Sequence, residues 1–535
     1  MATRKKKSAP PTELRISLND PGMTPLHKAG LAGLAMTLER LRRPPRVEWG
    51  WDPVGAQSVR LFWGESGPDA LLEFLFCEGL ALDEATGLVD FPALRGRLGQ
   101  PASYEERWLF QRALTGTFLK QSRSRKLGDE RFLVLDPDSK HPPVSYRPMT
   151  FFRHQDQHEA LSKRLAKPTQ KGIRFVGWLV PGAVEKHPGT AQTRMSQLPG
   201  PYLALCFAPV GSLCFLMRGA GSRGYALVLP EINDLKGYAR FRRRFTHLTA
   251  EQLYVAGSED AAMLVALSMH TGLEKATSGP GGQRFCQAIE FRRQIWNSKE
   301  PVRTSVIAIK PPDARALHNY RLAWSLSEFQ TRRVRTKDGT GTWFATSPSR
   351  GAIAKALGEG RAWWEGVAEV YRRGGSDVRA AFEQVLERKG LNIMVKRAEW
   401  DEHSERRFVE ACHEAMRHLY GSIGGQTREA GTGFEQKART ELVRIRSSLL
   451  RAKNAESFRS ALMDFWARAS RTKVRSNPTL RGTDPETGKP GWYAVLPLLR
   501  DDSWTRARDL ALLALISYSG KTPDDDDDAV EPNED

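Results

Sequence analysis

After Gly351 the sequence changes to long stretches in which apolar residues recur three and four positions apart, the spacing of an amphipathic helix. Because the connections between these stretches are short, the pattern predicts a helical bundle over residues 351–521. Five stretches are expected as helices: Ser376 to Lys389, Arg397 to Tyr420, Phe434 to Lys453, Ala455 to Ser470 and Asp501 to Ser519.

One expected helix carries an apolar stripe between two rows of basic residues. The stripe consists of Phe434, Ala438, Leu442, Ile445 and Leu449. At 100° per residue, one basic row lies about 100° to one side of the stripe and the other about 100° to the opposite side. The rows are Lys437, Arg444 and Arg451, and Arg439, Arg446 and Lys453. The sequence therefore predicts a helix whose buried face is flanked by phosphate-facing cations.

Residues 15–350 show a mixed pattern. Thr24 is a natural N-cap with Pro25 at the first helical position, which predicts a buried helix, and its glycines Gly30 and Gly33 suggest close approach of another backbone. Short apolar stretches bounded by Gly or Pro are expected as strands: Tyr202 to Phe207, Leu213 to Met217, Ala226 to Leu229 and Val302 to Ile309. The expected fold class is α+β, a mixed N-terminal α/β region followed by an all-α C-terminal helical bundle.

Both ends of the chain are expected to be disordered tails. Residues 1–14 are basic, and residues 522–535 are acidic with a run from Asp524 to Asp528. The acidic tail could shield a basic surface, although a solubilising role is the commoner explanation.

The charge balance favours a polyanionic partner. Lys and Arg total 81 against 62 Asp and Glu, a formal net charge of +19. A biased genomic base composition would also enrich arginine, so the distribution of the charges must decide. The five cysteines are scattered without a Cys-x-x-Cys pair, which favours a reducing cytoplasm over a disulfide framework or a structural zinc site. No secretory signal or membrane-spanning run is expected.

Catalytic signatures are not found. His413 and His418 lie five residues apart, too far around a helix for one metal, and are expected on the exposed surface. His154 and His158 have the four-residue spacing with Asp156 between them, but a solvated polar helix is the preferred interpretation. Neither a P-loop nor a nucleophile elbow is present. We therefore expect no enzyme activity, metal or cofactor.

Basic clusters with neighbouring aromatic or small polar residues are the positive signal for nucleic-acid binding. Each cluster taken alone is more often a solvated face, and the glycine-rich segment from Arg218 to Gly224 is equally consistent with a hairpin turn. The candidates outside the helical rows are Lys120, Gln121, Arg123, Arg125, Lys126, Arg218, Ser222, Arg223, Arg242, Arg243, Arg244, Arg332, Arg333, Arg335, Arg471, Lys473, Arg475 and Asn477.

Several segments resemble the large subunit of a type I CRISPR surveillance complex (Cascade), of the type I-B kind. They are Ile16 to Leu34, Thr117 to Lys126, Arg475 to Pro478, Trp492 to Leu499 and Ala507 to Leu515. The resembling segments lie near both ends and in the middle of the chain. None of them is a catalytic signature.

The resemblance implies a non-catalytic, cytoplasmic subunit of an RNA-guided antiviral complex. Such a subunit recognises a short flanking motif, the PAM, in double-stranded DNA, helps to open the duplex and holds the displaced strand of the R-loop. Residues 15–350 would contact the guide-RNA handle and the PAM-side DNA. Implied partners are the guide CRISPR RNA, target DNA, the backbone, handle-binding and small subunits, and an effector helicase-nuclease or transposition proteins.

The helical C-terminal region also resembles the separate small subunit of such complexes. In type I-B systems this subunit can arise from an internal start, and Met394 is suitably placed for one. The alternative function is a stand-alone RNA-binding or structural interaction protein that uses the helical region to dock a partner.

Overall fold

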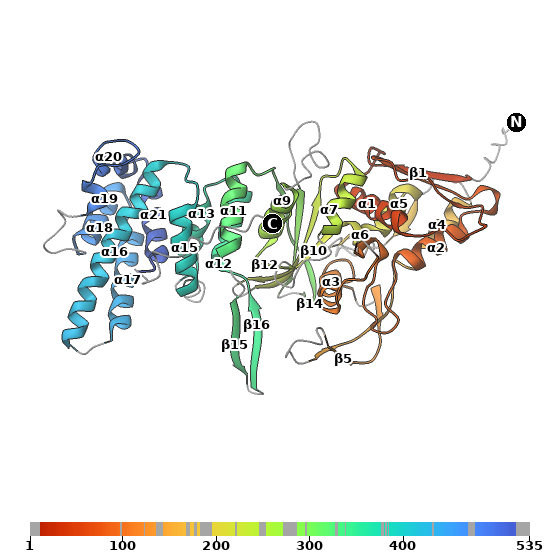
Figure 1. Ribbon diagram of the computed structural model, residues 1–535, viewed down its shortest axis with the longest axis horizontal. Coiled ribbons are helices and arrows are strands. Elements are labelled where there is room, and N and C mark those ends of the chain that lie inside the picture. Colours follow the sequence, from red (N-terminus) through yellow and green to blue (C-terminus); the bar gives the residue numbers. More distant parts are fainter. Residues whose placement is uncertain are drawn as a thin grey trace, which may run out of the picture. The chain divides into compact units, whose positions relative to one another are not determined.

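The structure is a computed structural model, shown in Figure 1. It describes residues 11–96, 99–121, 124–134, 143–166, 172–175, 179–181, 195–219, 222–244, 253–270, 286–294, 297–326, 330–336, 339–375, 379, 382, 385–430, 433–468 and 477–520. The chain divides into two compact units, Met1–Pro311 and Pro312–Asp535. The division falls before the expected boundary at 350/351, because the first two helices after Pro312 pack with the helical unit.

The N-terminal unit is built around a five-stranded sheet of strand order β12-β10-β11-β13-β14. All neighbours are antiparallel except the pair β10 and β12. The strands are β10 (Leu213–Gly219), β11 (Ser222–Pro230), β12 (Tyr254–Val255), β13 (Cys286–Gln294) and β14 (Asn297–Ile309). Three of the four predicted strands are thereby confirmed.

The fourth predicted strand, Tyr202 to Phe207, is wrong. This segment belongs to helix α5 (Pro199–Cys206), in which Pro199 occupies the first turn. Every residue from Gly200 to Cys206 is buried. A short, fully buried helix shows no apolar periodicity, so its sequence cannot be distinguished from a buried strand by pattern alone.

Helix α1 (Pro25–Arg40) packs against α5 and the short helix α6 (Ala208–Gly211). A Cβ atom at Gly30 would lie 1.9 Å from the carbonyl oxygen of Ala204, and one at Gly33 would lie 2.4 Å from that of Phe207. The expected backbone approach is therefore confirmed, as is Thr24 as the N-cap residue. Only glycine fits at these two positions.

Smaller elements surround this core. A three-stranded antiparallel sheet begins at Glu13, within the tail that was expected to be disordered, because β1 pairs along its whole length with β3. The remaining elements of the unit are β1 (Glu13–Ser17), β2 (Gly50–Trp51), β3 (Ser58–Phe62), α2 (Asp69–Gly79), α3 (Tyr104–Gly116), β4 (Arg125–Leu127), β5 (Arg131–Leu133), β6 (Val144–Tyr146), β7 (Met149–Phe152), α4 (Gln157–Leu165), β8 (Ile173–Phe175), β9 (Met195–Gln197), α7 (Leu235–Arg244) and α9 (Ser258–His270). The acidic tail lies outside the described residues.

The C-terminal unit is helical apart from the hairpin of β15 (Gln330–Thr336) and β16 (Gly339–Ala345), which extends away from the helices of its unit (Figure 1). The fold class predicted from the sequence is confirmed. The principal helices are α11 (Ala314–Leu326), α12 (Pro348–Gly358), α13 (Trp363–Arg373), α15 (Val385–Arg397), α16 (His403–Ala430), α17 (Phe434–Arg451), α18 (Ala455–Arg468), α19 (Pro478–Arg481), α20 (Gly491–Val495) and α21 (Trp504–Ser517).

Helix α21 lies at the centre of this unit and contacts α13, α15, α16, α17 and α18. Its apolar run from Leu510 to Ile516 is fully buried. None of the described helices combines the length and the apolarity that a membrane crossing requires.

The predicted boundaries of α17 and α18 are close to the observed ones, whereas those of two earlier helices are displaced. Helix α15 continues to Arg397, and α16 begins only at His403. The break follows from local bonding, because Trp400 turns back and its indole N–H donates to the carbonyl oxygen of Val395 at 3.2 Å.

Candidate nucleic-acid interface

The apolar stripe of α17 is buried as predicted, except at its first residue. Ala438, Leu442, Ile445 and Leu449 are buried, whereas Phe434 is 41% exposed. The aromatic ring at the start of the helix therefore opens onto the surface of the unit.

The basic side chains that flank this stripe differ in their exposure and in their partners. Arg439, Arg451 and Lys453 are exposed. Arg444 lies 3.7 Å from Glu441, and Arg446 stacks over the ring of Tyr371 at 5.8 Å. Lys437 is half-buried. The exposed members can reach a polyanion without first breaking a close ion pair.

A groove with a volume of about 760 Å³ lies beside the first residues of the α17 stripe. Four helices of the C-terminal unit or the segments next to them form it: the start of α15, the middle of α16, the start of α17 and the residues after α21. We call this the α17 groove. Its lining is Val385, Arg388, Arg417, Tyr420, Gly421, Phe434, Glu435, Ala438, Arg439, Leu442, Tyr518, Ser519 and Gly520.

Three aromatic rings line the α17 groove. The centroid of Tyr420 lies 6.0 Å from that of Phe434 and 5.4 Å from that of Tyr518. Burial, together with the neighbouring Tyr420, raises the pKa of Tyr518 to about 12, so its hydroxyl stays neutral at physiological pH. Neutral rings with open faces or edges are suitable platforms for nucleobases.

Three guanidinium groups accompany the rings. Arg417 forms an ion pair with Glu414, whereas Arg388 and Arg439 form none with any carboxylate in the described part of the chain. One carboxylate, Glu435, also lines the groove. Aromatic platforms beside a positive groove are the combination by which proteins hold single-stranded nucleic acid without reading its sequence.

The predicted cluster from Lys120 to Lys126 follows α3 and enters strand β4. Arg125 donates to the carbonyl oxygen of Leu119, and the ammonium group of Lys126 lies 5.4 Å from the ring centroid of Phe151. Lys126 is exposed, Lys120 and Gln121 are half-buried, and Arg123 lies outside the described residues. Among the members of this cluster that the structure describes, Lys126 is the most accessible to phosphate.

The three arginines near the end of α7 have different environments. Arg242 is buried in the interior of the N-terminal unit, and Arg243 pairs with Glu39 at 2.6 Å. Arg244 ends the helix, and its side chain lies outside the described part of the chain. Burial removes Arg242 from any surface that could follow a phosphate backbone.

The segment from Arg218 to Gly224 forms a tight β10–β11 hairpin, in which Gly219 pairs with Ser222. Arg218 lies 5.5 Å from the ring centroid of Tyr254. Ser222 and Arg223 are in β11, and only their backbone is described. The hairpin interpretation is confirmed, and entry into a DNA groove stays a prediction.

The other two basic clusters are described only in part. Arg332, Arg333 and Arg335 are placed on β15 by their backbone, opposite Trp343, Thr342 and Thr340. Arg471, Lys473 and Arg475 lie outside the described residues.

Asn477 serves the fold directly. Its side-chain amide donates to the carbonyl oxygen of Ala411 at 3.0 Å, and its oxygen accepts from the backbone N–H groups of Thr479 and Leu480. The asparagine therefore caps α19 and ties it to α16.

Two expectations about the exposure of the histidine pairs are wrong. His154 is fully buried beside Phe118 and Phe152, and burial lowers its pKa to about 3. His413 is half-buried, because α21 packs beside it and its Nε2 atom lies 2.8 Å from the hydroxyl oxygen of Ser517. No group of three His, Cys, Asp or Glu side chains suited to a metal occurs among the described residues.

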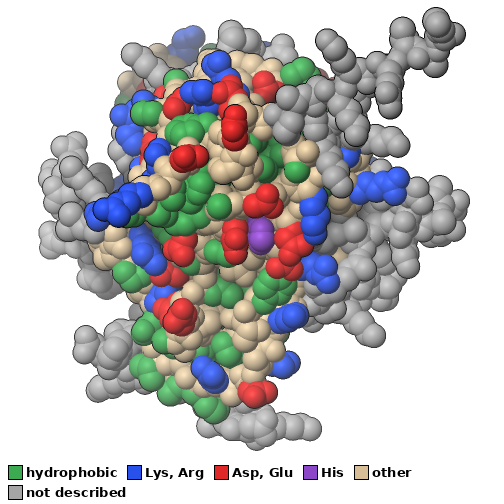
Figure 2. All heavy atoms as spheres, turned by 90° about the vertical axis from the view of Figure 1, so that its right-hand side faces the viewer, with side chains coloured by type: hydrophobic (Ala, Val, Ile, Leu, Met, Phe, Trp, Pro, Cys, Tyr) green, Lys and Arg blue, Asp and Glu red, His purple; other side chains and the backbone are tan. Residues whose placement is uncertain are grey.

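The space-filling view shows one face of the N-terminal unit (Figure 2). On its described part, basic and acidic side chains are intermixed. Elsewhere in the N-terminal unit, Arg60 pairs with both Glu13 and Asp52. Such pairing reduces the positive field available to a polyanion.

Sequence reasoning missed four side chains of the α17 groove: Arg388, Arg417, Tyr420 and Tyr518. They are far apart in the sequence and come from different elements, so no local motif contains them. Phe434, which the sequence assigns to the buried stripe, gave no sign of an opening at this end of α17.

The fold and the groove define a class: a two-unit α+β protein whose helical unit carries a basic, aromatic groove suited to nucleic acid. Two family models match the chain in order, the DevT N-terminal domain over residues 15–206 and the DevT C-terminal domain over residues 396–535. The first lies within the N-terminal unit and the second within the helical unit.

The chain is also 29% identical over 543 residues to the CRISPR-associated protein Cas8a1/Csx13 of Myxococcus xanthus (strain DK1622). The match covers 97% of this chain and 91% of that protein. The predicted resemblance is therefore confirmed in its coarser part, since this chain is similar to a CRISPR-associated protein along nearly its whole length.

Proposed function

We propose that this chain is a non-catalytic large subunit of a CRISPR RNA-guided DNA surveillance complex, and that its α17 groove holds the displaced DNA strand. The observation that carries the proposal is the similarity to a CRISPR-associated protein along nearly the whole chain. The groove supplies the chemistry, because the rings of Phe434 and Tyr420 can stack on bases while Arg388, Arg417 and Arg439 neutralise phosphates.

Other roles within this proposal belong to the N-terminal unit. Lys126 and the hairpin at Arg218 are candidates for contact with the guide-RNA handle or the PAM-side duplex. The arginines of β15 are placed on a hairpin that extends from the helical unit, which suits insertion beside an opening duplex. Guide CRISPR RNA and the other subunits of the complex are the proposed partners.

The small-subunit-like character of the C-terminal region, and with it the type I-B assignment, is a further part of the proposal. The DevT C-terminal match begins at residue 396, two positions after Met394. A second product that starts at Met394 and disappears in the Met394→Leu variant would support an internal start. A single full-length product from both genes would contradict it.

The test of the groove is binding of single-stranded DNA by the purified full chain at several salt concentrations. Phe434→Ala and Tyr420→Ala should each weaken binding by about 5- to 150-fold, since base stacking contributes roughly 1–3 kcal/mol per base. Arg439→Ala should also reduce the slope of log K against log salt by about 0.7 if it neutralises one phosphate.

Two matched controls lie elsewhere on the same unit. Met463 is an exposed apolar residue of α18, and Arg373 is an exposed arginine of α13 paired with Glu369. Met463→Ala and Arg373→Ala should bind as the wild type does. Salt-independent binding, or groove variants that bind like these controls, would overturn the assignment of the groove.

The alternative function, a stand-alone RNA-binding or structural interaction protein, predicts a different assembly. A surveillance subunit should co-purify with guide RNA and backbone subunits encoded beside a CRISPR array. A chain whose gene has no such neighbours and which purifies without guide RNA would favour the alternative. Metal-dependent cleavage of DNA or RNA by the purified chain would contradict the non-catalytic assignment.

A further inference from the structure

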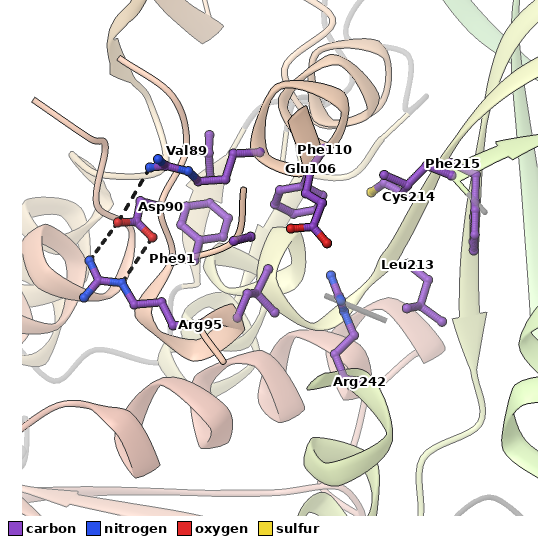
Figure 3. A pocket seen from close by; sticks show the side chains of 14 residues that line it. Val89, Asp90, Phe91, Arg95, Glu106, Phe110, Leu213, Cys214, Phe215 and Arg242 are labelled. Atoms are coloured by element: carbon purple, nitrogen blue, oxygen red, sulfur yellow. Dashed lines mark hydrogen bonds and ion pairs between the residues drawn. The ribbon is translucent and has the colours of Figure 1, made fainter. Parts of the chain in front are cut away.

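The N-terminal unit contains a second pocket, which is separate from the α17 groove. It lies between α3, the segment from Val89 to Arg95, the start of β10 and the end of α7 (Figure 3). Its walls are largely apolar and include Phe91, Phe110, Leu213, Cys214 and Phe215. The cavity volume is about 50 Å³, which is space for roughly four water-sized groups.

Arg242 points into this pocket from α7 (Figure 3). The residue is 3% exposed, and its guanidinium lies 5.9 Å from the ring centroid of Phe110. Its Nε atom has no hydrogen-bond partner, and no ion pair joins Arg242 to any carboxylate in the described part of the chain. Burial lowers the pKa of the guanidinium, although an arginine remains charged at neutral pH.

The other two arginines that line the pocket are neutralised within the fold. Arg107 lies 2.7 Å from Asp83, and Arg95 lies 2.8 Å from Asp90. The carboxylates of Asp83 and Asp90 are therefore already engaged by these two arginines. Arg242 is therefore the one guanidinium of the lining that the described fold leaves without a counter-charge.

Glu106 faces Arg242 from the opposite wall of the pocket (Figure 3). One of its carboxylate oxygens accepts from the backbone N–H of Ser103 at 2.8 Å, a capping box that fixes Glu106 at the start of α3. Glu106 is half-buried, whereas Arg242 lies deep. A half-buried negative group and a deeply buried positive group thus face each other without forming an ion pair.

An unpaired buried charge is costly, and a well-packed apolar side chain in its place is often more stable. The simplest way to satisfy both groups is a ligand with a negative end for Arg242 and a positive end for Glu106. A phosphate would satisfy the arginine but would place a second negative charge beside Glu106. A nucleobase is larger than the cavity.

We propose that this pocket binds a small zwitterion of the α-amino-acid class. The ligand carboxylate accepts two hydrogen bonds from the planar guanidinium of Arg242, and the ligand ammonium donates to Glu106. The apolar walls exclude water and so strengthen both contacts. The cavity volume limits the ligand to an amino acid with a very short side chain.

The proposal is tested by calorimetric titration of the full chain with glycine and with L-alanine, compared with propionate and ethylamine. At least one of the two amino acids should bind at least tenfold more tightly than either singly charged probe. Arg242→Met should weaken its binding by about ten- to a hundredfold, because charge-assisted hydrogen bonds are lost. The same variant should melt at a higher temperature than the wild type without ligand, because an unpaired buried charge is removed.

Glu106→Gln tests the other end of the ligand. Glutamine preserves the capping box, so α3 should stay intact while amino-acid binding falls about tenfold and propionate binding does not fall. The matched control is Arg243→Met, the next residue of α7, which pairs with Glu39 and does not line the pocket. This control should bind the amino acid as the wild type does.

Three results would overturn the proposal. They are no binding of either amino acid, propionate binding as tight as amino-acid binding, or unchanged affinity in Arg242→Met. If Arg242→Met does not fold, Arg242→Lys replaces it, since lysine keeps the charge but loses the two-pronged contact. Unchanged amino-acid affinity in Arg242→Lys would then contradict the bidentate contact.

Discussion

At the scale of single residues, the fold holds several titratable groups in the protonation state that burial favours. His27, at the third position of α1, is 4% exposed, and burial lowers its pKa to about 4. Its Nδ1 atom accepts from the backbone N–H of Thr24 at 3.3 Å. Since a backbone amide can only donate, Nδ1 carries no proton, and the Thr24 hydroxyl, 2.7 Å away, donates to it as well. The start of α1 therefore depends on a neutral imidazole.

This dependence predicts a loss of stability in mild acid. The pKa of His27 is lowered in the folded state, so its contribution is present above the unfolded value of about 6.5 and is lost as pH falls below it. Between pH 7 and pH 5 the wild type should lose about 2 kcal/mol of unfolding free energy relative to His27→Gln. Glutamine can keep the capping box but does not titrate. Urea unfolding at both pH values tests this, and identical pH dependence in the two proteins would contradict it.

A buried carboxylate in the helical unit, that of Glu405, makes stability depend on pH in the opposite direction from His27. Burial raises the pKa of Glu405 to about 7, although Arg506 and the indole N–H of Trp364 oppose the shift. A raised pKa contributes stability below the unfolded value, and this contribution is lost as pH rises through about 7. The wild type should therefore lose stability relative to Glu405→Gln between pH 6 and pH 8. Thermal melts of both proteins across this range measure the difference, and parallel curves would disprove the prediction.

At the scale of elements, helix pairs in both units approach so closely that one methyl group decides their packing. In the helical unit, a Cβ atom at Gly366 of α13 would lie 2.0 Å from the carbonyl oxygen of Ala352 in α12. Gly425 of α16 has no atom within 4 Å of the corresponding position. Both glycines lie within helices, but only Gly366 is in close contact with another helix.

Alanine at these positions should have opposite effects. Gly366→Ala should destabilise the protein by about 2–4 kcal/mol, because two backbones must separate. Gly425→Ala should stabilise it by about 0.5–1 kcal/mol through helix propensity alone. Denaturant midpoints of the two variants and the wild type provide the measurement. Equal midpoints for the two variants would show that the contact between α12 and α13 is not tight.

Elements with strong periodicity were predictable from the sequence, and those defined by tertiary contacts were not. The stripe of α17 and the N-cap at Thr24 are local patterns, and both are confirmed. The helix α5 was missed because it is buried on all sides. The α17 groove was not predicted, because its rings and cations meet from distant parts of the chain. Of its lining, Arg439 was expected to contact phosphate, and Phe434 was expected to be buried. The burial of Arg242 was likewise invisible in the sequence, which shows only three consecutive arginines between two aromatic residues.

At the scale of the whole molecule, the division at Pro311 and Pro312 does not coincide with the start of the DevT C-terminal match. The helical unit includes α11, α12 and α13, which precede residue 396. Trp364 of α13 donates to Glu405 at 3.2 Å, and Arg372 lies 3.4 Å from Asp509 of α21. The central helix is therefore covered partly by residues outside the matched domain.

This coverage predicts that two C-terminal fragments differ in stability. A fragment of residues 312–535 should unfold cooperatively in urea when the transition is monitored by far-ultraviolet circular dichroism. A fragment of residues 394–535 exposes the faces of α16 and α21 that α13 covers, so it should have a lower midpoint or no cooperative transition. Equal midpoints would show that α11 to α13 add nothing to the stability of the bundle. In that case a product from Met394 would need no partner to fold.

The contact of α1 with α5 and α6 also sets the order in which the N-terminal unit can form. Gly30 and Ala204 meet although about 170 residues of chain separate them, so helix α1 must wait for α5 before its apolar face is covered. At about 5–20 residues per second, the ribosome needs roughly 10–35 s to synthesise that interval. During this time the first helix of the nascent chain presents uncovered leucines, and it is the segment on which a ribosome-associated chaperone should act first.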